Sequence, residues 1–195
     1  HHRKDPLAQH PRMRARGAGD PERRKRREPI TLKQTKMSLK RSVLLAGAAG
    51  KMGREVVKTL AQSVHYHLHC AFTHQSGLGQ DAGQFAGTPE PIHVELQSFS
   101  PALLSAQLAE AERPIWLDLS VCDSAFSHVS YVLSQGVPAV IGATGFSLSQ
   151  LNTFEELTNT HQTAVLLAPN FSIGALLMIR FAQLASKHFN WAEII

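Results

Sequence analysis

The sequence predicts an α/β fold with a doubly wound, mostly parallel sheet. Two observations support this prediction. From residue 42 onward, short apolar runs alternate with longer helical patterns, which is the order expected of strand–helix–strand units. The runs are also continuously apolar rather than alternating, as in "PAVIG" and "AVLLA". Such runs are typical of parallel strands that are covered on both faces.

The apolar runs and the helical patterns give the expected elements in chain order. Strands are expected at residues 43–46, 67–72, 115–119, 138–141 and 164–167. Helices are expected at residues 52–62, 101–111, 124–135, 147–159 and 174–187. The short connections between them favour the doubly wound arrangement. The final residues, "WAEII", indicate a strand that is cut short, as if a second, α+β domain were beginning.

Residues 1–41 are expected to form a basic disordered extension. They hold 14 Lys/Arg and 4 Asp/Glu, whereas residues 42–195 hold 6 and 11. With almost no apolar periodicity, the segment cannot bury enough surface to offset its ordering entropy. The run "RRKRR" (Arg23–Arg27) could bind nucleic acid or serve as a localisation signal. A solvated charge run is favoured, so no nucleic-acid partner is expected. Met37 also fits a natural start, which would make the preceding residues a foreign leader.

The composition favours a soluble cytoplasmic protein. Two cysteines, Cys70 and Cys122, cannot form a disulfide framework and suit a reducing compartment. No apolar stretch approaches the roughly 20 residues of a membrane span. The N-terminus shows no apolar signal-peptide segment. No membrane partner is therefore expected.

A glycine-rich turn stands at the first strand–helix junction, in "SVLLAGAAGKMGREVV" (Ser42–Val57). Such a turn presents backbone N–H groups at the positive end of a helix dipole, where a diphosphate binds well. Ala48 and Ala49 are small enough to keep side chains out of the way. Glycines alone would mark only a turn, but this position in an α/β pattern is the context that confirms a dinucleotide fingerprint. We therefore expect a Rossmann-type dinucleotide-binding domain over residues 42–170.

Each of the three glycines in this turn has an expected task. Gly47 permits the tight turn, and Gly50 lets the backbone approach the phosphates. Gly53 lets the helix pack close to the sheet. An acidic residue about 20 positions later would hold the ribose hydroxyls of NAD, but Thr73 and His74 stand there instead. Their lack of negative charge removes repulsion against a 2′-phosphate, which favours NADPH, or use of both cofactors, over NADH alone.

Two later stretches fall at the carboxyl ends of expected strands. They are "VIGATGFS" (Val140–Ser147) and "LLAPNFSIGALLM" (Leu166–Met178). Open α/β sheets bind ligands at that edge. Exposed backbone and one amide side chain suit a nicotinamide carboxamide, which needs both donors and acceptors. Taken singly, each turn would be structural, but together with the glycine loop they indicate one crevice.

Four segments in order, "GAAGKMGR", "DLS", "GATGF" and "APNFSIG", resemble the 4-hydroxy-tetrahydrodipicolinate reductase family, also called dihydrodipicolinate reductase. The resemblance covers roughly residues 42–195. It implies an enzyme of lysine and diaminopimelate biosynthesis that transfers a hydride from NADH or NADPH to a small cyclic imine dicarboxylate. It also implies a homotetramer for the full-length protein.

The resemblance assigns cofactor contacts to three groups of residues. Those that would hold the diphosphate are Gly47, Ala48, Ala49, Gly50, Lys51 and Met52. Those in the nicotinamide ribose region are Gly142, Ala143 and Thr144. Those that would hold the nicotinamide are Ala168, Pro169, Asn170 and Phe171.

The resemblance assigns no catalytic residue to this chain. The family's His-His and Lys motif and its "DAPSGT" loop should begin one or two residues after "AEII". Residues 171–195 are therefore expected to be the start of a truncated catalytic and oligomerisation domain. The chain alone is expected to bind the cofactor without reducing the substrate. The alternative is a non-catalytic dinucleotide-binding or assembly protein of the same fold.

Other chemically suggestive residues receive no functional role. His65, His67 and His69 in "HYHLHC" have a spacing that could hold a metal, but no nearby Cys, Asp or Glu completes the set, so no metal is expected. Cys122 lacks a visible activating partner.

Two acidic residues lie beside the "DLS" segment. Asp118 and Asp123 could form a carboxylate pair. The favoured interpretation is that Asp118 ends a strand and Asp123 caps the helix that starts near Ser124.

Overall fold

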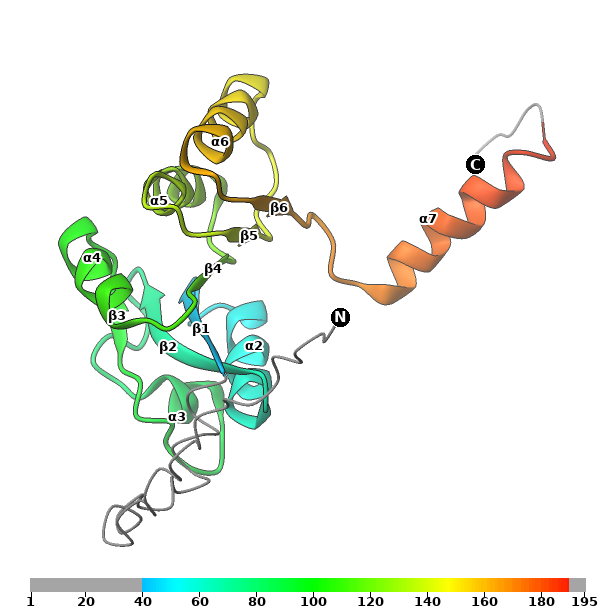
Figure 1. Cartoon of the computed structure of the whole chain (residues 1–195). Coiled ribbons are helices and arrows are strands. Elements are labelled where there is room, and N and C mark those ends of the chain that lie inside the picture. Colours follow the sequence, from blue (N-terminus) through cyan, green and yellow to red (C-terminus); the bar gives the residue numbers. More distant parts are fainter. Residues whose placement is uncertain (1–39, 190–195) are drawn as a thin grey trace, which may run out of the picture.

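The computed structural model describes residues 40–189 (Figure 1). Most of the predicted basic extension and the strand predicted in "WAEII" lie outside the described residues. The predicted end of the basic extension, residue 41, is one residue too late. Arg41 already belongs to the first strand and pairs with Tyr66. Within the described part, no helix has both the length and the apolar character needed to cross a membrane.

The described residues contain six strands, which form one parallel sheet. They are β1 (Arg41–Ala46), β2 (Tyr66–Thr73), β3 (Leu96–Ser98), β4 (Ile115–Asp118), β5 (Ala139–Ile141) and β6 (Val165–Leu167). Their order across the sheet is β3-β2-β1-β4-β5-β6, and all neighbouring strands run parallel. The α/β, doubly wound, Rossmann-type prediction is confirmed. The five predicted strands are all present, and β3 is an edge strand that was not predicted.

Between residues 40 and 189, six helices connect or follow the strands. They are α2 (Lys51–Gln62), α3 (Ala82–Ala86), α4 (Pro101–Glu110), α5 (Cys122–Ser134), α6 (Leu148–His161) and α7 (Ile173–Ala185). Five of them match predicted helices to within about two residues, the usual disagreement at helix ends, and α3 was not predicted. Local signals fix two of the starts. Ser100 caps α4 directly before Pro101, and Ser147 forms a capping box with Gln150 at the start of α6.

The predicted cap at Asp123 is wrong. Helix α5 begins at Cys122, and its N-cap residue is Val121, which makes no side-chain hydrogen bond to the helix. Asp123 therefore lies inside the first turn, where its charge still faces the positive end of the helix dipole. Asp118 does end a strand, as predicted, but it lies apart from Asp123 in a buried network of its own.

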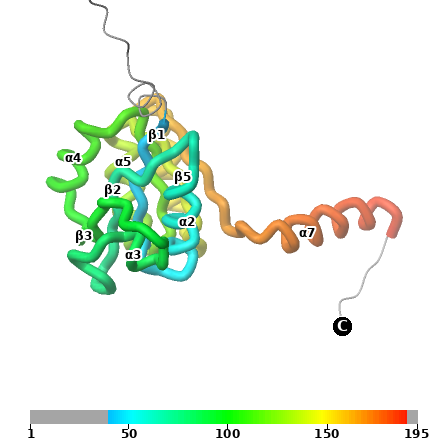
Figure 2. Tube along the Cα trace, turned by 90° about the horizontal axis from the view of Figure 1, so that it is seen from below, coloured from blue at the N-terminus to red at the C-terminus, as the bar shows by residue number. Residues whose placement is uncertain are grey.

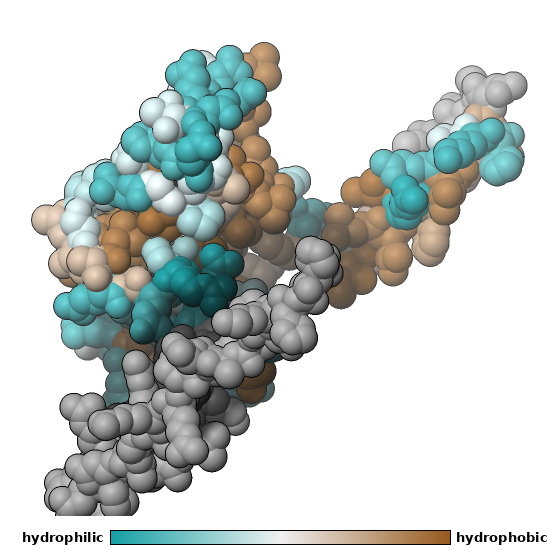
Figure 3. Space-filling model, in the orientation of Figure 1, coloured by the Kyte–Doolittle hydropathy of each residue, from teal (hydrophilic) through white to brown (hydrophobic). Residues whose placement is uncertain are grey.

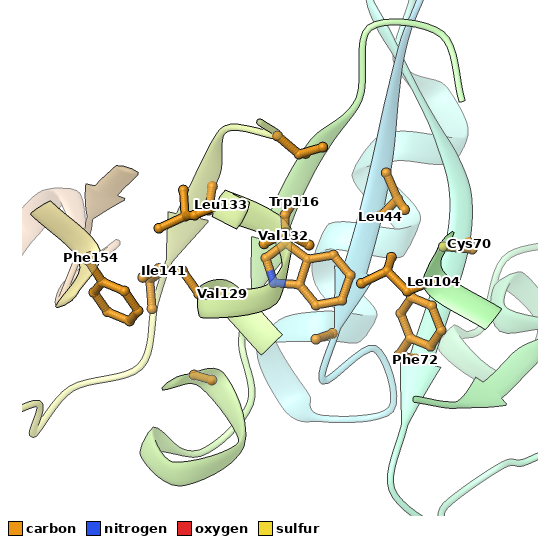
Figure 4. Packing of buried hydrophobic residues seen from close by; sticks show 14 residues of the cluster. Leu44, Cys70, Phe72, Leu104, Trp116, Val129, Val132, Leu133, Ile141 and Phe154 are labelled. Carbon is orange, nitrogen blue, oxygen red and sulfur yellow. The ribbon is translucent and has the colours of Figure 1, made fainter. Parts of the chain in front are cut away.

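Helices cover both faces of the sheet, and consecutive residues of β1 divide between them. Leu44 belongs to the larger core cluster, which packs under α4, α5 and α6 and includes Trp116 and Phe154 (Figure 4). Leu45 belongs to the second cluster, which packs under α2 and α3. Because successive side chains of a strand point to opposite faces, continuous burial along β1 requires both layers. This explains why the strand is apolar without alternation.

Helix α7 differs from the other long helices because none of its residues is buried. It projects away from the sheet and its helical layers (Figure 2). Hydrophobic side chains gather along its surface (Figure 3), and Ile173, Met178 and Phe181 are each more than 60% exposed. The domain division predicted after residue 170 stays a prediction.

The strand order creates a switch point beside β1. The chain leaves β1 toward β2 and β3 on one side and then crosses to β4, β5 and β6 on the other. Connections therefore diverge above the carboxyl ends of β1 and β4. This is where open α/β sheets leave a crevice for ligands.

Candidate functional site

Two adjoining hollows lie at the carboxyl edge of the sheet, one on each side of this switch point. The first has a volume of about 710 Å³ and is lined by residues that follow β1, β2, β3 and β4, together with residues of α5. The second has a volume of about 370 Å³ and is lined by residues near β4, β5 and β6 and by the start of α2. Leu119 lines both hollows. The two hollows are therefore neighbours on either side of Leu119, the residue that follows β4.

The glycine loop separates the two hollows and is fixed by backbone packing. Gly47 has a φ of +78°, the left-handed conformation that favours glycine. A Cβ at this position would lie 2.6 Å from the carbonyl oxygen of Leu119, so no side chain fits there. Gly50 donates its N–H to the carbonyl oxygen of Gly47 at 3.0 Å. The tight turn predicted at Gly47 is confirmed.

Gly53 also allows α2 to pack closely against another part of the chain. That part is the glycine loop, whereas the sequence predicted the sheet. A Cβ at residue 53 would lie 2.8 Å from Cα of Ala48 and would overlap the carbonyl oxygen of Gly47. The first turn of α2 is therefore packed against the glycine loop itself. The loop and the helix start form one rigid unit.

The N-terminus of α2 is open to an anion. Gly50 is the N-cap residue and supplies no side-chain acceptor, and the first turn contains no acidic residue. The first backbone N–H groups of a helix have no intrahelical partner, and the helix dipole adds positive potential there. A phosphate group fits this position both sterically and electrostatically.

The loop residues that were assigned to the diphosphate occupy different positions around the hollows. Gly47, Ala49 and Gly50 line the first hollow, and Met52 lines the second. Ala48 is buried, and its N–H donates to the carbonyl oxygen of Phe72 at 3.0 Å. Lys51 is exposed and lines neither hollow.

The second hollow brings together two segments that are far apart in the sequence. Gly142, Pro169, Asn170 and Phe171 line it. A Cβ at Gly142 would lie 2.8 Å from the ring of Phe171, so the two turns are in direct contact. The side-chain oxygen of Asn170 accepts a hydrogen bond from the N–H of Ser172 at 2.8 Å, which leaves the amide nitrogen available to a ligand.

Three other residues assigned to the nicotinamide end lie beside this hollow without lining it. They are Ala143, Thr144 and Ala168. Ala143 packs against the larger core cluster, and Thr144 is exposed. Ala168 donates its N–H to the carbonyl oxygen of Ile141 at 2.8 Å, which extends the pairing of β5 and β6.

The end of β2 forms another wall of the first hollow. Thr73, His74 and Ser76 line it, and the Thr73 hydroxyl donates to the carbonyl oxygen of Ser76 at 3.1 Å. None of the described residues that line this hollow is acidic. The sequence has Thr73 and His74 where an NAD-specific site has an acidic residue. The other described residues that line this hollow have no carboxylate either.

The far wall of the first hollow was missed by the sequence analysis. It is built from Ser98 at the end of β3, from Phe99 directly after it, and from Ser124 and His128 on α5. Ser98 and Phe99 lie at the carboxyl end of a strand, so recognition of β3 would have revealed them. Ser124 and His128 are four residues apart on a helix and therefore share a face. That spacing was a signal that could have been used.

Asp118 lies buried directly beneath this wall. Its Oδ2 accepts hydrogen bonds from Nε1 of Trp116 at 3.0 Å and from Nδ1 of His128 at 3.1 Å. Its Oδ1 accepts from the N–H and the hydroxyl of Ser120. Burial opposes ionisation of this carboxyl, but the hydrogen bonds from His128 and Ser120 outweigh it, so the pKa of Asp118 lies below its ordinary value.

The histidines of "HYHLHC" belong to the opposite end of β2. Nε2 of His67 lies 3.4 Å from the hydroxyl oxygen of Ser42, and Nε2 of His69 lies 3.0 Å from the carbonyl oxygen of Gln107. Among residues 40–189, no three His, Cys, Asp or Glu side chains are grouped so that they could hold a metal ion. Burial, followed by the neighbouring His69 and Lys40, lowers the pKa of His67.

Comparison with known proteins places this geometry in a family. The family described as "Dihydrodipicolinate reductase, N-terminus" matches residues 41–171. The 4-hydroxy-tetrahydrodipicolinate reductase of Trichormus variabilis is 36% identical over 159 residues, which cover 78% of this chain and 56% of that protein. The enzyme of the same name from Moorella thermoacetica is 37% identical over 153 residues and is covered to 55%. The chain thus spans little more than half the length of these relatives.

A solved structure shows the same arrangement. Dihydrodipicolinate reductase from Paenisporosarcina sp. TG-14, with dipicolinate bound, superposes with a TM-score of 0.62 at 29% sequence identity. The likeness covers 77% of this chain and 55% of that one. The family match includes the glycine loop and extends to Phe171, so both hollows are built almost entirely from matched residues. The chain belongs to the dihydrodipicolinate reductase family, and its residues 41–171 match the N-terminal part of that family.

Proposed function

We propose that the protein reduces 4-hydroxy-tetrahydrodipicolinate to tetrahydrodipicolinate with NADH or NADPH, and that residues 41–171 bind the cofactor. The observation that supports this most directly is the pair of hollows that meet at Leu119 on either side of the glycine loop. A dinucleotide has two nucleoside halves joined by a diphosphate. Two neighbouring hollows with an anion-binding helix start between them match that shape.

The glycine loop fits the diphosphate because its tight backbone turn leads directly into an uncapped helix start. A Cβ at Gly47 would meet backbone within 2.6 Å, and Gly50 stands at the uncapped start of α2. In this proposal the backbone N–H groups of the first turn of α2 bind the diphosphate oxygens, since those of Ala48 and Gly50 in the loop already donate to backbone carbonyl oxygens. No carboxylate lies in the first turn to oppose them.

The nicotinamide half belongs in the second hollow. Asn170 can donate its free amide N–H, and the exposed turns after β5 and β6 offer backbone groups. The ring of Phe171 and the side chain of Met52 supply apolar surface for the flat nicotinamide ring. When bound, the reduced cofactor supplies the hydride. The residues around it hold the ring in one orientation, which is what a directed transfer requires.

The adenosine half belongs in the first hollow, with its ribose near the end of β2. An NAD-specific site places a carboxylate there to bind the ribose hydroxyls. Here Thr73, His74 and Ser76 line the wall, and no acidic group would repel a 2′-phosphate. We therefore propose that NADPH is bound at least as well as NADH.

The substrate needs groups that this domain does not supply. A dicarboxylate substrate requires cationic partners, and its imine nitrogen requires a proton donor. Neither hollow is lined by a lysine or an arginine of the described chain. We propose that a C-terminal domain following residue 171 supplies these groups and that α7 belongs to it, since α7 buries none of its residues against the cofactor domain.

The wider setting follows from the same assignment. We propose that the enzyme acts in lysine and diaminopimelate biosynthesis in the cytoplasm, as a homotetramer. Both cysteines of the described chain are free, as is usual in a reducing compartment. The apolar surface of α7 is consistent with burial in a larger assembly.

The test compares the 195-residue chain with the protein translated from the complete reading frame. Oxidation of NADPH is followed at increasing concentrations of 4-hydroxy-tetrahydrodipicolinate. We expect substrate-dependent oxidation by the complete protein and none by the 195-residue chain. Complete protein that binds NADPH but never oxidises it with this substrate would favour a non-catalytic dinucleotide-binding protein and contradict the proposal.

A further inference from the structure

We propose that His67 and Ser42 form a pH-sensitive switch that closes the connection between α4 and β4 at neutral pH and releases it in mild acid. The connection is residues 111–114, and it lies at the amino-terminal edge of the sheet. The inference goes beyond the proposed function and does not rest on it, because neither hollow is lined by these residues.

Ser42 holds the connection to the first strand. The N–H of Ser42 donates to the carbonyl oxygen of Glu112 at 3.0 Å, and the Ser42 hydroxyl oxygen accepts from the Glu112 N–H at 2.9 Å. Arg113 follows with a φ of +50°, a conformation that costs free energy for a residue with a side chain. Glu112 and Arg113 are exposed, whereas Ser42 is fully buried. Two of the hydrogen bonds that keep this strained, exposed turn in place therefore belong to one buried serine.

The hydroxyl hydrogen of Ser42 needs an acceptor, and within the described part of the chain that acceptor is His67. Nε2 of His67 lies 3.4 Å from the hydroxyl oxygen. It can accept the hydrogen only in a neutral ring whose proton is on Nδ1. A protonated ring donates from both nitrogens, so Ser42 would face two donors and its own hydrogen would be buried without a partner. The closed connection therefore favours a neutral His67.

Most of the surroundings of His67 oppose a positive charge on its ring. The ring centroid of His69, on the same strand, is 6.0 Å away, and Lys40 directly precedes β1. Burial is the largest cause that lowers the pKa of His67, followed by these two groups, while Glu112 in the connection acts in the opposite direction. Release of the connection would expose the ring to water. Proton uptake in mild acid therefore favours the open form.

The neighbouring His69 does not take part in the switch. Its Nε2 lies 3.0 Å from the carbonyl oxygen of Gln107 in α4, and a carbonyl oxygen can only accept. Nε2 of His69 therefore donates in the neutral and in the charged ring alike. The switch thus acts on the connection after α4 and leaves the helix attached to β2 through His69.

Hydrogen–deuterium exchange of the 195-residue chain, read by mass spectrometry at about pH 8 and about pH 5.5, tests the switch. The readout is the protection factor of a peptide that contains residues 111–113, which corrects for the effect of pH on exchange itself. Its protection should fall about three- to tenfold in acid, because a free imidazole with a pKa of about 6.5 is protonated about ten times more often than neutral at about pH 5.5. The exchange should also be faster than that of β1 and insensitive to low urea, as in a local opening.

Variants of the histidines separate the switch from other effects of acid. His67→Gln keeps an amide near the place of Nε2 and does not titrate, so the protection of residues 111–113 should be the same at both pH values. His67→Leu is the second variant, for use if the glutamine variant is not folded by circular dichroism at about pH 8. His65→Gln, the same change at an exposed histidine two residues earlier, is the matched control and should behave like the wild-type chain.

Several results would overturn the switch. One is unchanged protection of residues 111–113 in the wild-type chain, and another is an equal loss of protection in the folded His67 variant. Exchange of residues 111–113 at the same rate and with the same urea dependence as β1 would also overturn it, because the connection would then open only when the whole domain unfolds. Because no nucleotide is added, none of these results bears on the proposed dinucleotide site.

Discussion

Gly53 of α2 packs directly on the backbone of Gly47, with no space for a β-carbon between them. The contact joins the first and third glycines of the loop. It also explains why the helix start is held close to the end of β1 without a side-chain cap at Gly50. The anion-binding geometry is thus set by backbone packing before any ligand arrives.

Gly53→Ala should destabilise the domain. The added Cβ would overlap the Gly47 carbonyl oxygen and lie 2.8 Å from Cα of Ala48, and backbone atoms cannot yield as a flexible side chain can. We expect a loss of about 2 kcal/mol or more in the free energy of unfolding, measured by urea denaturation. Gly174→Ala is the matched control, because Gly174 is also helical but meets only the Ser172 hydroxyl oxygen at 3.8 Å. It should be neutral or slightly stabilising, and equal losses at both sites would contradict the packing argument.

Asp118→Asn should lower stability in a pH-dependent way. The native pKa of Asp118 lies below its ordinary value of 3.8, so folding favours the ionised form. The stabilisation is complete well above pH 3.8 and is lost as the pH falls through the native pKa. At pH 7 the variant should be less stable by about 2 kcal/mol or more, because an amide cannot accept from all the donors around it. The gap between the two chains should close in acid, and a gap that widens there would show that Asp118 is not ionised in the folded protein.

His67 should make the protein sensitive to mild acid. Its pKa is lowered from 6.5, chiefly by burial, so the unfolded chain takes up a proton before the folded chain does. Stability should therefore fall as the pH drops below 6.5 toward the native pKa of this ring. His67→Gln should remove this part of the pH dependence in thermal melts. Melts at pH 8, where the ring is neutral in both states, serve as the reference. An identical slope for both chains between pH 7 and 5.5 would rule out a contribution from His67.

Removal of α7 should leave the cofactor domain folded. A chain that ends after Ser172 loses no buried residue of that helix, so the free energy of unfolding should change by less than about 1 kcal/mol. The tendency to self-associate should fall with the loss of the exposed Ile173, Met178 and Phe181. Urea denaturation and sedimentation measure the two effects. A large loss of stability would place α7 inside the cofactor domain and contradict the proposed boundary.

Most of the sheet could be predicted because its strands are covered on both faces. Continuous apolar runs such as Val43–Ala46 can be recognised without tertiary information. Strand β3 was missed because only one of its three residues, Leu96, is apolar, whereas β5 and β6 are entirely apolar. Helix α3 was missed because its five residues are too few to show a period.

The sequence predicted the parts of the candidate site that are contiguous in the chain, but not the parts that depend on packing between elements. The glycine loop and the turns after β5 and β6 are each contiguous in sequence, so their motifs could be recognised directly. The pairing of Asp118 with His128 crosses from a strand end to the second turn of a helix. It depends on how α5 packs against the end of β4, which no local pattern encodes. The error at Asp123 has the same origin, because α5 begins at Cys122 rather than near Ser124.

Calorimetric titration of NADPH and NADH into the wild-type chain, Gly50→Glu and Gly50→Ala tests the central claim that the glycine loop binds a dinucleotide. Gly50 has a φ of −70° and a ψ of 168°, which alanine can adopt, and a Cβ there would lie 3.2 Å from the carbonyl oxygen of Gly47. The wild-type chain should bind both cofactors with dissociation constants of about 10⁻⁶ to 10⁻³ M, and Gly50→Ala should bind them no more than about tenfold more weakly. Gly50→Glu, with a carboxylate where the diphosphate lies, should show no binding. Equal affinity of folded Gly50→Glu and the wild-type chain would contradict the assignment of the loop.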